Sequence, residues 1–109
     1  MLSTLFGNKT AERVLLYLQN YGEGYATQIA RTFGAAQSQV QKQLSRLEQG
    51  DVLVSVLEGR TRRYRLNPRW PFRKELAVLL ERALASLPRE EIALRYRRRT
   101  RPRRPGKVL

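Results

Sequence analysis

The sequence predicts a mainly α-helical domain with one small β-hairpin, which is an α+β fold. Three observations lead to this prediction: helical spacing of apolar residues in four segments, one short run rich in valine and leucine, and glycine or proline at the segment boundaries. The chain has 109 residues, and 41% of them are hydrophobic. This length suits one domain with a single modest core.

The first predicted helix follows Asn8, which can cap it, while Glu12 favours the positive end of the helix dipole. Gly22 and Gly24 end this helix. Its apolar residues recur at helical spacing and are Ala11, Val14, Leu15 and Leu18.

Two shorter helices follow, and a tight turn joins them. The second begins near Thr27 and breaks at Gly34, where the turn needs a positive φ. The third covers about residues 37–49 and stops at Gly50. A small residue four positions before Gly34 lets the third helix cross closely over the second. The inward-facing residues of the two helices are Ile29, Ala30, Phe33, Val40, Leu44 and Leu47.

A hairpin is predicted after these helices. Residues 52–57 (VLVSVL) and 61–66 (TRRYRL) form its strands, and Glu58, Gly59 and Arg60 form its turn. Two helices joined by a tight turn and followed by an arginine-tipped hairpin are the pattern of a helix-turn-helix with a wing. We therefore predict a winged helix-turn-helix with a three-helix core, a wing and a C-terminal helix.

The C-terminal helix is predicted from Pro71, which suits a first helical turn, to Leu87, with Pro88 after its end. Its apolar stripe is broad, so part of it can pack inside the domain and part against a second copy. We expect residues 1–87 to form one DNA-binding domain, with a dimerisation helix at about 71–87. The residues expected at a homodimer interface are Leu2, Leu5, Phe6, Phe72, Leu76, Leu79, Leu80, Ala83, Leu84 and Leu87.

Residues 88–109 are expected to form a flexible basic tail, because arginine and proline dominate it and apolar residues are few. Such a tail can grip phosphates without reading sequence, or it can simply aid solubility. Tyr96 could stack on an exposed base, which keeps RNA open as a partner. The tail residues expected to bind DNA are Arg97, Arg98, Arg99, Arg101, Arg103 and Arg104.

The overall composition excludes several classes of function. The net charge is +13, from 22 Lys and Arg against 9 Asp and Glu, and it favours a polyanionic partner. Cysteine and histidine are both absent, which removes thiolate metal sites, the commonest metal ligand, a thiol nucleophile and the usual general base. We therefore expect no enzyme activity, no metal and no cofactor. We find neither a signal peptide nor a long apolar run, so we expect a cytoplasmic protein with no membrane segment.

The outward face of the third helix is the predicted recognition surface. It lies opposite Val40 and Leu44 and carries no acidic residue before Glu48. Gln can pair with adenine, Lys and Arg with guanine, and Ser with either base. The alternative is an ordinary solvated face, although such faces normally mix Glu with Lys. The residues expected to contact DNA are Gln37, Ser38, Gln39, Gln41, Lys42, Ser45 and Arg46.

The hairpin tip supplies a second basic surface, with Arg60, Arg62 and Arg63 expected to bind DNA. Between Arg60 and Lys74 there are seven basic residues and no acidic one. A wing of this kind can follow the phosphate backbone or enter the minor groove. The alternative is an edge hairpin that charge protects from aggregation, but lysine and glutamate would serve that purpose equally well.

The sequence resembles the winged helix-turn-helix transcriptional regulators of bacteria and archaea, in particular the ArsR-like group. The matching segments are LFGNKTAERVLLYL, TQIARTFGAAQSQVQKQLSRLEQGDVL and GRTRRYRLNP, and the resemblance covers roughly residues 5–87. It implies a dimeric DNA-binding repressor or a related regulator, with base contacts from the third helix. The metal-sensing members bind metal through cysteine and histidine, which this chain lacks, so the resemblance implies no metal site here.

The function expected from the sequence is therefore a sequence-specific regulator that binds double-stranded DNA, a repressor acting as a homodimer. Two alternatives stay open. The first is a protein that binds RNA, or nucleic acid without specificity. The second is a protein-interaction winged helix whose basic surface docks an acidic partner.

Overall fold

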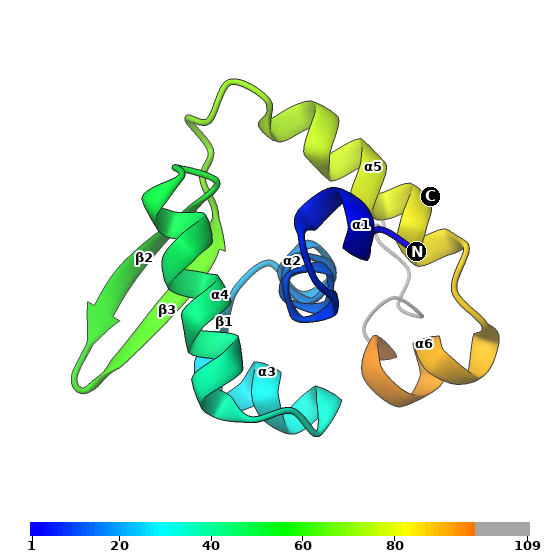
Figure 1. Cartoon of the computed structure of the whole chain (residues 1–109), viewed down its shortest axis with the longest axis horizontal. Helices are drawn as coiled ribbons and strands as arrows, with labels where there is room; N and C mark the ends of the chain where they lie inside the picture. Colours follow the sequence, from blue (N-terminus) through cyan, green and yellow to red (C-terminus); the bar gives the residue numbers. More distant parts are fainter. Residues whose placement is uncertain (98–109) are drawn as a thin grey trace, which may run out of the picture.

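The computed structural model describes residues 1–97, which form helices around one three-stranded antiparallel sheet (Figure 1). This arrangement confirms the predicted α+β class. The elements in chain order are α1 (Ser3–Phe6), α2 (Lys9–Tyr21), β1 (Gly24–Tyr25), α3 (Ala26–Phe33), α4 (Gln37–Gln49), β2 (Leu53–Glu58), β3 (Thr61–Leu66), α5 (Arg73–Ala85) and α6 (Arg89–Arg95).

Helix α2 is the centre of the core, and it begins as the sequence predicts. The Asn8 side-chain oxygen accepts a hydrogen bond from the Ala11 N–H at 2.8 Å. Helices α3, α4 and α5 all contact α2. Leu15 of α2, Leu44 of α4 and Leu84 of α5 are each at most 1% exposed and belong to one apolar cluster. Burial of this cluster fixes the position of α4.

The turn between α3 and α4 also matches the prediction. Gly34 adopts the left-handed conformation, with φ +62°, and its N–H closes the end of α3. The predicted small residue, Ala30, is 6% exposed. Helix α4 then begins at Gln37 and ends at Gln49, as the sequence predicts.

The predicted hairpin is present, and a short third strand extends it. Strands β2 and β3 pair from Leu53 opposite Leu66 to Glu58 opposite Thr61. Strand β1 pairs with the other edge of β3. Strand β1 was not predicted from the sequence, because two residues are too few to show an alternating pattern.

The C-terminal part of the described chain differs from the predicted flexible tail. Tyr96, at the end of helix α6, is only 1% exposed, with its ring 6.0 Å from that of Phe33. The expectation that Tyr96 stacks on a nucleic-acid base is therefore wrong. The Tyr21 hydroxyl donates to the Arg95 carbonyl at 2.7 Å and accepts from the Arg97 N–H at 3.2 Å. These contacts make residues 89–97 part of the fold.

The apolar stripe of α5 divides between the core and the surface. Leu80, Ala83 and Leu84 are at most 5% exposed and pack inside the protein. Their expected place at a dimer interface is therefore wrong, since α2 already covers them. Phe72, which was expected there, is 61% exposed, and Val78, which was not, is 68% exposed.

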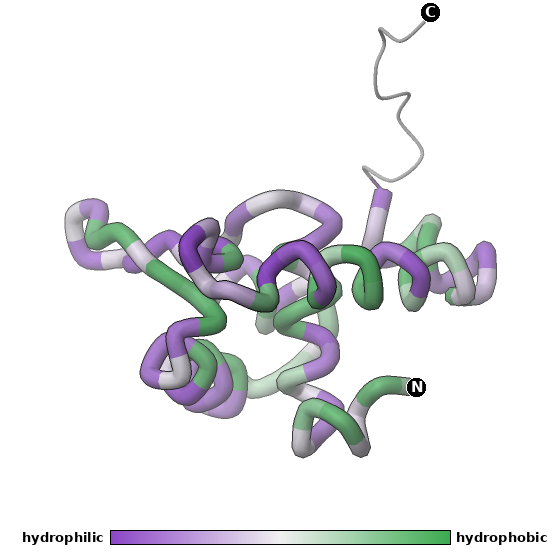
Figure 2. The backbone as a smooth tube through the Cα atoms, turned by 90° about the horizontal axis from the view of Figure 1, so that it is seen from above, coloured by the Kyte–Doolittle hydropathy of each residue, from purple (hydrophilic) through white to green (hydrophobic). Residues whose placement is uncertain are grey.

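The N-terminal residues form another apolar part of the surface, and the chain beside the N-terminus is green in Figure 2. Leu5 in α1 is 68% exposed, whereas Leu2 and Phe6 pack against the core. Within residues 1–97, no helix is long and apolar enough to cross a membrane.

Candidate nucleic-acid interface

The outward face of α4 has the orientation that the sequence predicts. Val40 and Leu44 are buried, Gln41 and Lys42 between them are exposed, and Gln43 is buried. Lys42 is exposed and has no partner among the described residues. The other exposed residues of the predicted recognition surface are Gln37, Ser38, Gln39, Gln41, Ser45 and Arg46.

Three of these predicted residues, Gln41, Ser45 and Arg46, make side-chain hydrogen bonds within the protein. The Gln41 amide donates to the Tyr64 hydroxyl at 3.0 Å and to the Ser45 hydroxyl at 3.2 Å. Arg46 donates from Nη2 to the Phe6 carbonyl at 2.8 Å and from Nε to Gln43 Oε1 at 2.9 Å. Arg46 therefore ties α4 to the end of α1, which Lys42 does not.

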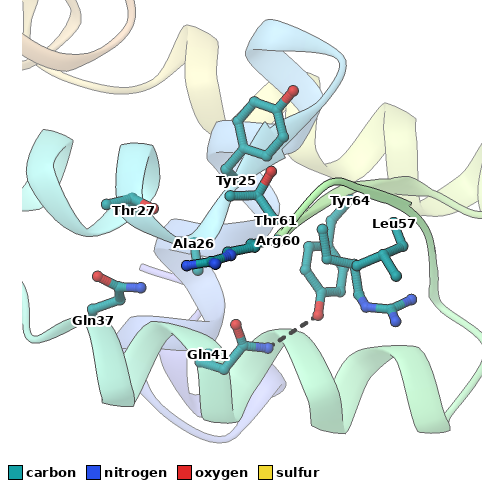
Figure 3. A pocket seen from close by; sticks show the side chains of 10 residues that line it. Tyr25, Ala26, Thr27, Gln37, Gln41, Leu57, Arg60, Thr61 and Tyr64 are labelled. Atoms are coloured by element: carbon teal, nitrogen blue, oxygen red, sulfur yellow. Dashed lines mark hydrogen bonds between the residues drawn. The ribbon is translucent and has the colours of Figure 1, made fainter.

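A cavity of about 320 Å³ lies between α4 and the wing (Figure 3). Arg60 extends across it from the wing toward Ala26, at the start of α3. Gln41 and Tyr64 close one side through their hydrogen bond. The remaining lining residues are Tyr25, Thr27, Gln37, Leu57, Thr61 and Arg62. The cavity brings the predicted residues of α4 and the wing together, and its charged side chains are both arginines.

The wing arginines fall on two faces of the sheet. Side chains of paired residues share a face, so Arg63 lies on the face of its partners Tyr25 and Val56. Arg62 and Tyr64 belong to the opposite face, which meets α4 through Gln41. Arg62 donates from Nη1 to the Ser55 hydroxyl at 3.1 Å. The structure therefore brings Arg60 and Arg62 to the α4 cavity but not Arg63.

Arg63 lies instead between two carboxylates. Its Nη1 donates to Glu23 Oε1 at 2.6 Å, and its Nη2 and Nε donate to Glu58 Oε2 at 2.6 and 3.1 Å. The Tyr25 hydroxyl donates to Glu58 Oε1 at 2.8 Å. The hydrogen bonds from Arg63 and then from Tyr25 lower the pKa of the Glu58 carboxyl. The hydrogen bond to Glu58 in turn raises the pKa of Tyr25.

No site role was predicted for Glu58 or Glu23 from the sequence. The predicted hairpin placed Glu58 in its turn, whereas β2 extends to Glu58, which lies diagonally across from Arg63 and within reach of a long side chain. For Glu23 no signal exists, since its contact depends on β1, which the sequence did not reveal. Both carboxylates change how the charge of the wing is distributed.

The predicted tail contacts are separate from this surface. Arg97 follows α6, which lies across α2 from the wing in Figure 1. The other predicted tail residues, Arg98, Arg99, Arg101, Arg103 and Arg104, are outside the described residues. In the described part of the chain, no three Asp or Glu residues are grouped closely enough to hold a metal ion.

Comparison with known proteins supports the architecture. No protein-family model and no curated protein sequence matches the chain. Among solved structures, YusO from Bacillus subtilis matches with a TM-score of 0.56 at 21% identity, over 79% of this chain and 67% of that one. The adhesin competence repressor AdcR from Streptococcus pyogenes matches with a TM-score of 0.55 at 19% identity, over 79% and 72% of the two chains. The order of helices and strands and these likenesses together show that the chain has a winged helix-turn-helix fold.

Proposed function

We propose that this protein is a transcription regulator that binds a specific sequence in double-stranded DNA through α4 and the wing. The observation that carries this proposal is the exposed face of α4, which presents Ser38, Lys42 and Ser45 with no acidic residue among them. A helix of this size fits the major groove, where these side-chain types can pair with base edges.

The wing has a supporting part in the proposal. Arg60 and Arg62 border the cavity beside α4, so the phosphate backbone next to the groove lies within their reach. Such contacts fix the position of the protein on the duplex and add affinity that depends on salt. The tail arginines would add affinity in the same way. No chemical reaction is required, because occupancy of a promoter is itself the regulatory step.

We further propose that the protein acts as a homodimer and as a repressor. Leu5, Phe72 and Val78 are large apolar side chains that are each more than 60% exposed, and a second copy would cover them. A two-fold dimer also matches palindromic half-sites. One structural neighbour, AdcR, is named as a repressor. Assignment to the ArsR-like group rests on the sequence resemblance alone, and a cytoplasmic location is part of the same proposal.

Selection of bound sequences from a random duplex library tests DNA recognition. We expect enrichment of one motif, and for a dimer two inverted copies of it. Lys42→Ala should weaken binding to the selected site, whereas Lys9→Ala should change it little, because Lys9 is an exposed lysine of α2 near α6. Equal binding to random duplex and structured RNA, without enrichment, would favour the RNA alternative. Unchanged binding to an acidic protein partner in Lys42→Ala, with no DNA binding, would favour the docking alternative.

Analytical ultracentrifugation at micromolar concentration tests the dimer separately. We expect a dimer in the full chain, and Phe72→Asp should shift it toward monomer because a charge would then lie in the apolar contact. A wild-type chain that sediments only as a monomer would rule the dimer out.

A further inference from the structure

We propose that Arg63 is a positioning residue that braces the wing, and that Glu58 and Glu23 hold its guanidinium away from DNA. The inference rests on the proposed DNA-binding function and refines it. Arg60 and Arg62 then serve as the phosphate contacts of the wing. Arg63, although it neighbours Arg62 in sequence, has a different role.

The contacts of Arg63 leave little of it for a ligand. Three of its N–H groups point at carboxylate oxygens, at 2.6 Å to Glu23 and at 2.6 and 3.1 Å to Glu58. Two carboxylates around one guanidinium give a local charge of −1. A phosphate that approached this side chain would therefore meet net repulsion. Arg60 and Arg62 have no carboxylate partner among residues 1–97.

The same contacts connect the wing to the body of the protein. Glu23 lies in the turn between α2 and β1, Arg63 lies on β3, and Glu58 ends β2. The guanidinium of Arg63 on β3 thus contacts β2 through Glu58 and the turn before β1 through Glu23. The Tyr25 hydroxyl adds a contact from β1 to Glu58 at 2.8 Å. Because the guanidinium is planar and its donors are fixed, this set of contacts fixes how the end of β2 and the turn before β1 lie against β3.

Arg63 does not line the cavity between α4 and the wing, whereas Arg60 and Arg62 do. Tyr25 lines this cavity, but its hydroxyl donates to Glu58. The outer residues of the hairpin have little apolar support, since Val56 is 49% and Leu57 is 60% exposed. The polar contacts of Arg63 in the outer half of the hairpin are therefore a main source of its order, in addition to the pairing of its strands.

The salt dependence of DNA affinity distinguishes a brace from a phosphate contact. Each phosphate contact contributes about −0.9 to the slope of log affinity against log salt concentration. We expect Arg62→Gln to reduce the magnitude of the slope by about 0.9. Arg63→Gln should lower affinity with no more change in slope than the control Arg65→Gln, an exposed arginine on the same strand and face. A loss of about 0.9 in Arg63→Gln beyond that control would overturn the proposal.

Removal of the carboxylates gives the converse test. The double variant Glu23→Gln, Glu58→Gln should release the guanidinium and steepen the slope by up to about 0.9. Glu75→Gln, which removes an exposed charge from α5, serves as the control for net charge. The proposal that the carboxylates hold Arg63 back would be contradicted by one result. In that result the slope of the double variant changes by no more than twice the change that Glu75→Gln causes.

Hydrogen exchange in the free protein tests the brace without DNA. We expect the amides of β2 and β3 to exchange about two- to tenfold faster in Arg63→Gln than in the wild type, and the amides of α2 to be unchanged. Equal exchange in Arg63→Gln and Arg65→Gln would overturn the brace. A wild-type protein that fails to bind any duplex would refute the proposed function, while the exchange result would still decide whether Arg63 braces the wing.

Discussion

Helix α4 and the wing both present basic side chains, yet they are held in place by different forces. Apolar burial holds helix α4 in place, since Leu44 is 0% and Val40 is 1% exposed. The outer wing buries little, and strand pairing with the ion pairs of Arg63 holds it. Salt does not screen apolar burial, whereas exposed ion pairs weaken as salt rises. The position of α4 should therefore withstand conditions that loosen the wing.

The largest effect is expected when a buried side chain of α4 is shortened. Leu44→Ala removes a fully buried side chain and should lower the free energy of unfolding by about 2–5 kcal/mol. Leu57→Ala, on the exposed outer wing, should change it by no more than about 0.5 kcal/mol. Urea denaturation followed by circular dichroism measures both. Equal losses in the two variants would mean that the wing is as firmly buried as α4, contrary to the comparison.

A glycine at the base of the wing gives the next effect. A Cβ on Gly24 would lie 2.6 Å from Tyr17 Cε1. Tyr17 is 7% exposed, so its ring has little room to move. Gly24→Ala should therefore cost about 1–3 kcal/mol of stability through overpacking.

Gly34 provides the matched control for Gly24, because a Cβ there would meet nothing within 4 Å. Gly34→Ala carries only the strain of its φ of +62°, about 1–2 kcal/mol. Hydrogen exchange should locate the first change at β1 and the second at the turn between α3 and α4. An alanine at residue 24 that leaves β1 unaffected would show that the close approach to Tyr17 is not needed to anchor the wing.

The next prediction concerns the contact face of α4. Lys42→Ala should cost about 1–3 kcal/mol of binding free energy at a selected DNA site if the side chain contacts a base. Its stability should stay within about 0.5 kcal/mol of the wild type. Arg46→Ala should instead also lower stability, because it loses the bonds to Phe6 and Gln43. Fluorescence anisotropy and thermal unfolding measure the two properties, and unchanged binding in both variants would show that α4 is not the recognition helix.

These two regions also differ in how far the sequence could predict them. The bounds of α4 and the outward position of Lys42 follow from apolar residues at helical spacing, a signal that is local to the helix. The role of Arg63 could not follow in this way, because Glu23 is forty residues away in the chain and meets it only through β1. The prediction for Tyr96 was wrong for a related reason. Its arginine-rich surroundings suggested a solvated tail, but Phe33, far away in the sequence, buries it.

The smallest expected effect concerns the direct link between the two regions. The Ser55 hydroxyl of β2 donates to Glu48 Oε2 in the last turn of α4 at 2.7 Å and accepts from Arg62 at 3.1 Å. Ser55→Ala should lower the free energy of unfolding by about 0.5–1.5 kcal/mol, because it deletes hydrogen bonds that are only partly buried. Ser38→Ala, at an exposed serine of α4, should not lower it.

The same variant tests whether the wing and α4 act together on DNA. If the link through Ser55 sets the angle between them, Ser55→Ala should weaken DNA binding even though it removes no charge. The slope of log affinity against log salt concentration should stay unchanged. The loss should also be smaller in Ser55→Thr, which keeps a hydroxyl at that position. Wild-type affinity in Ser55→Ala would show that strand pairing and the Arg63 brace alone position the wing beside α4.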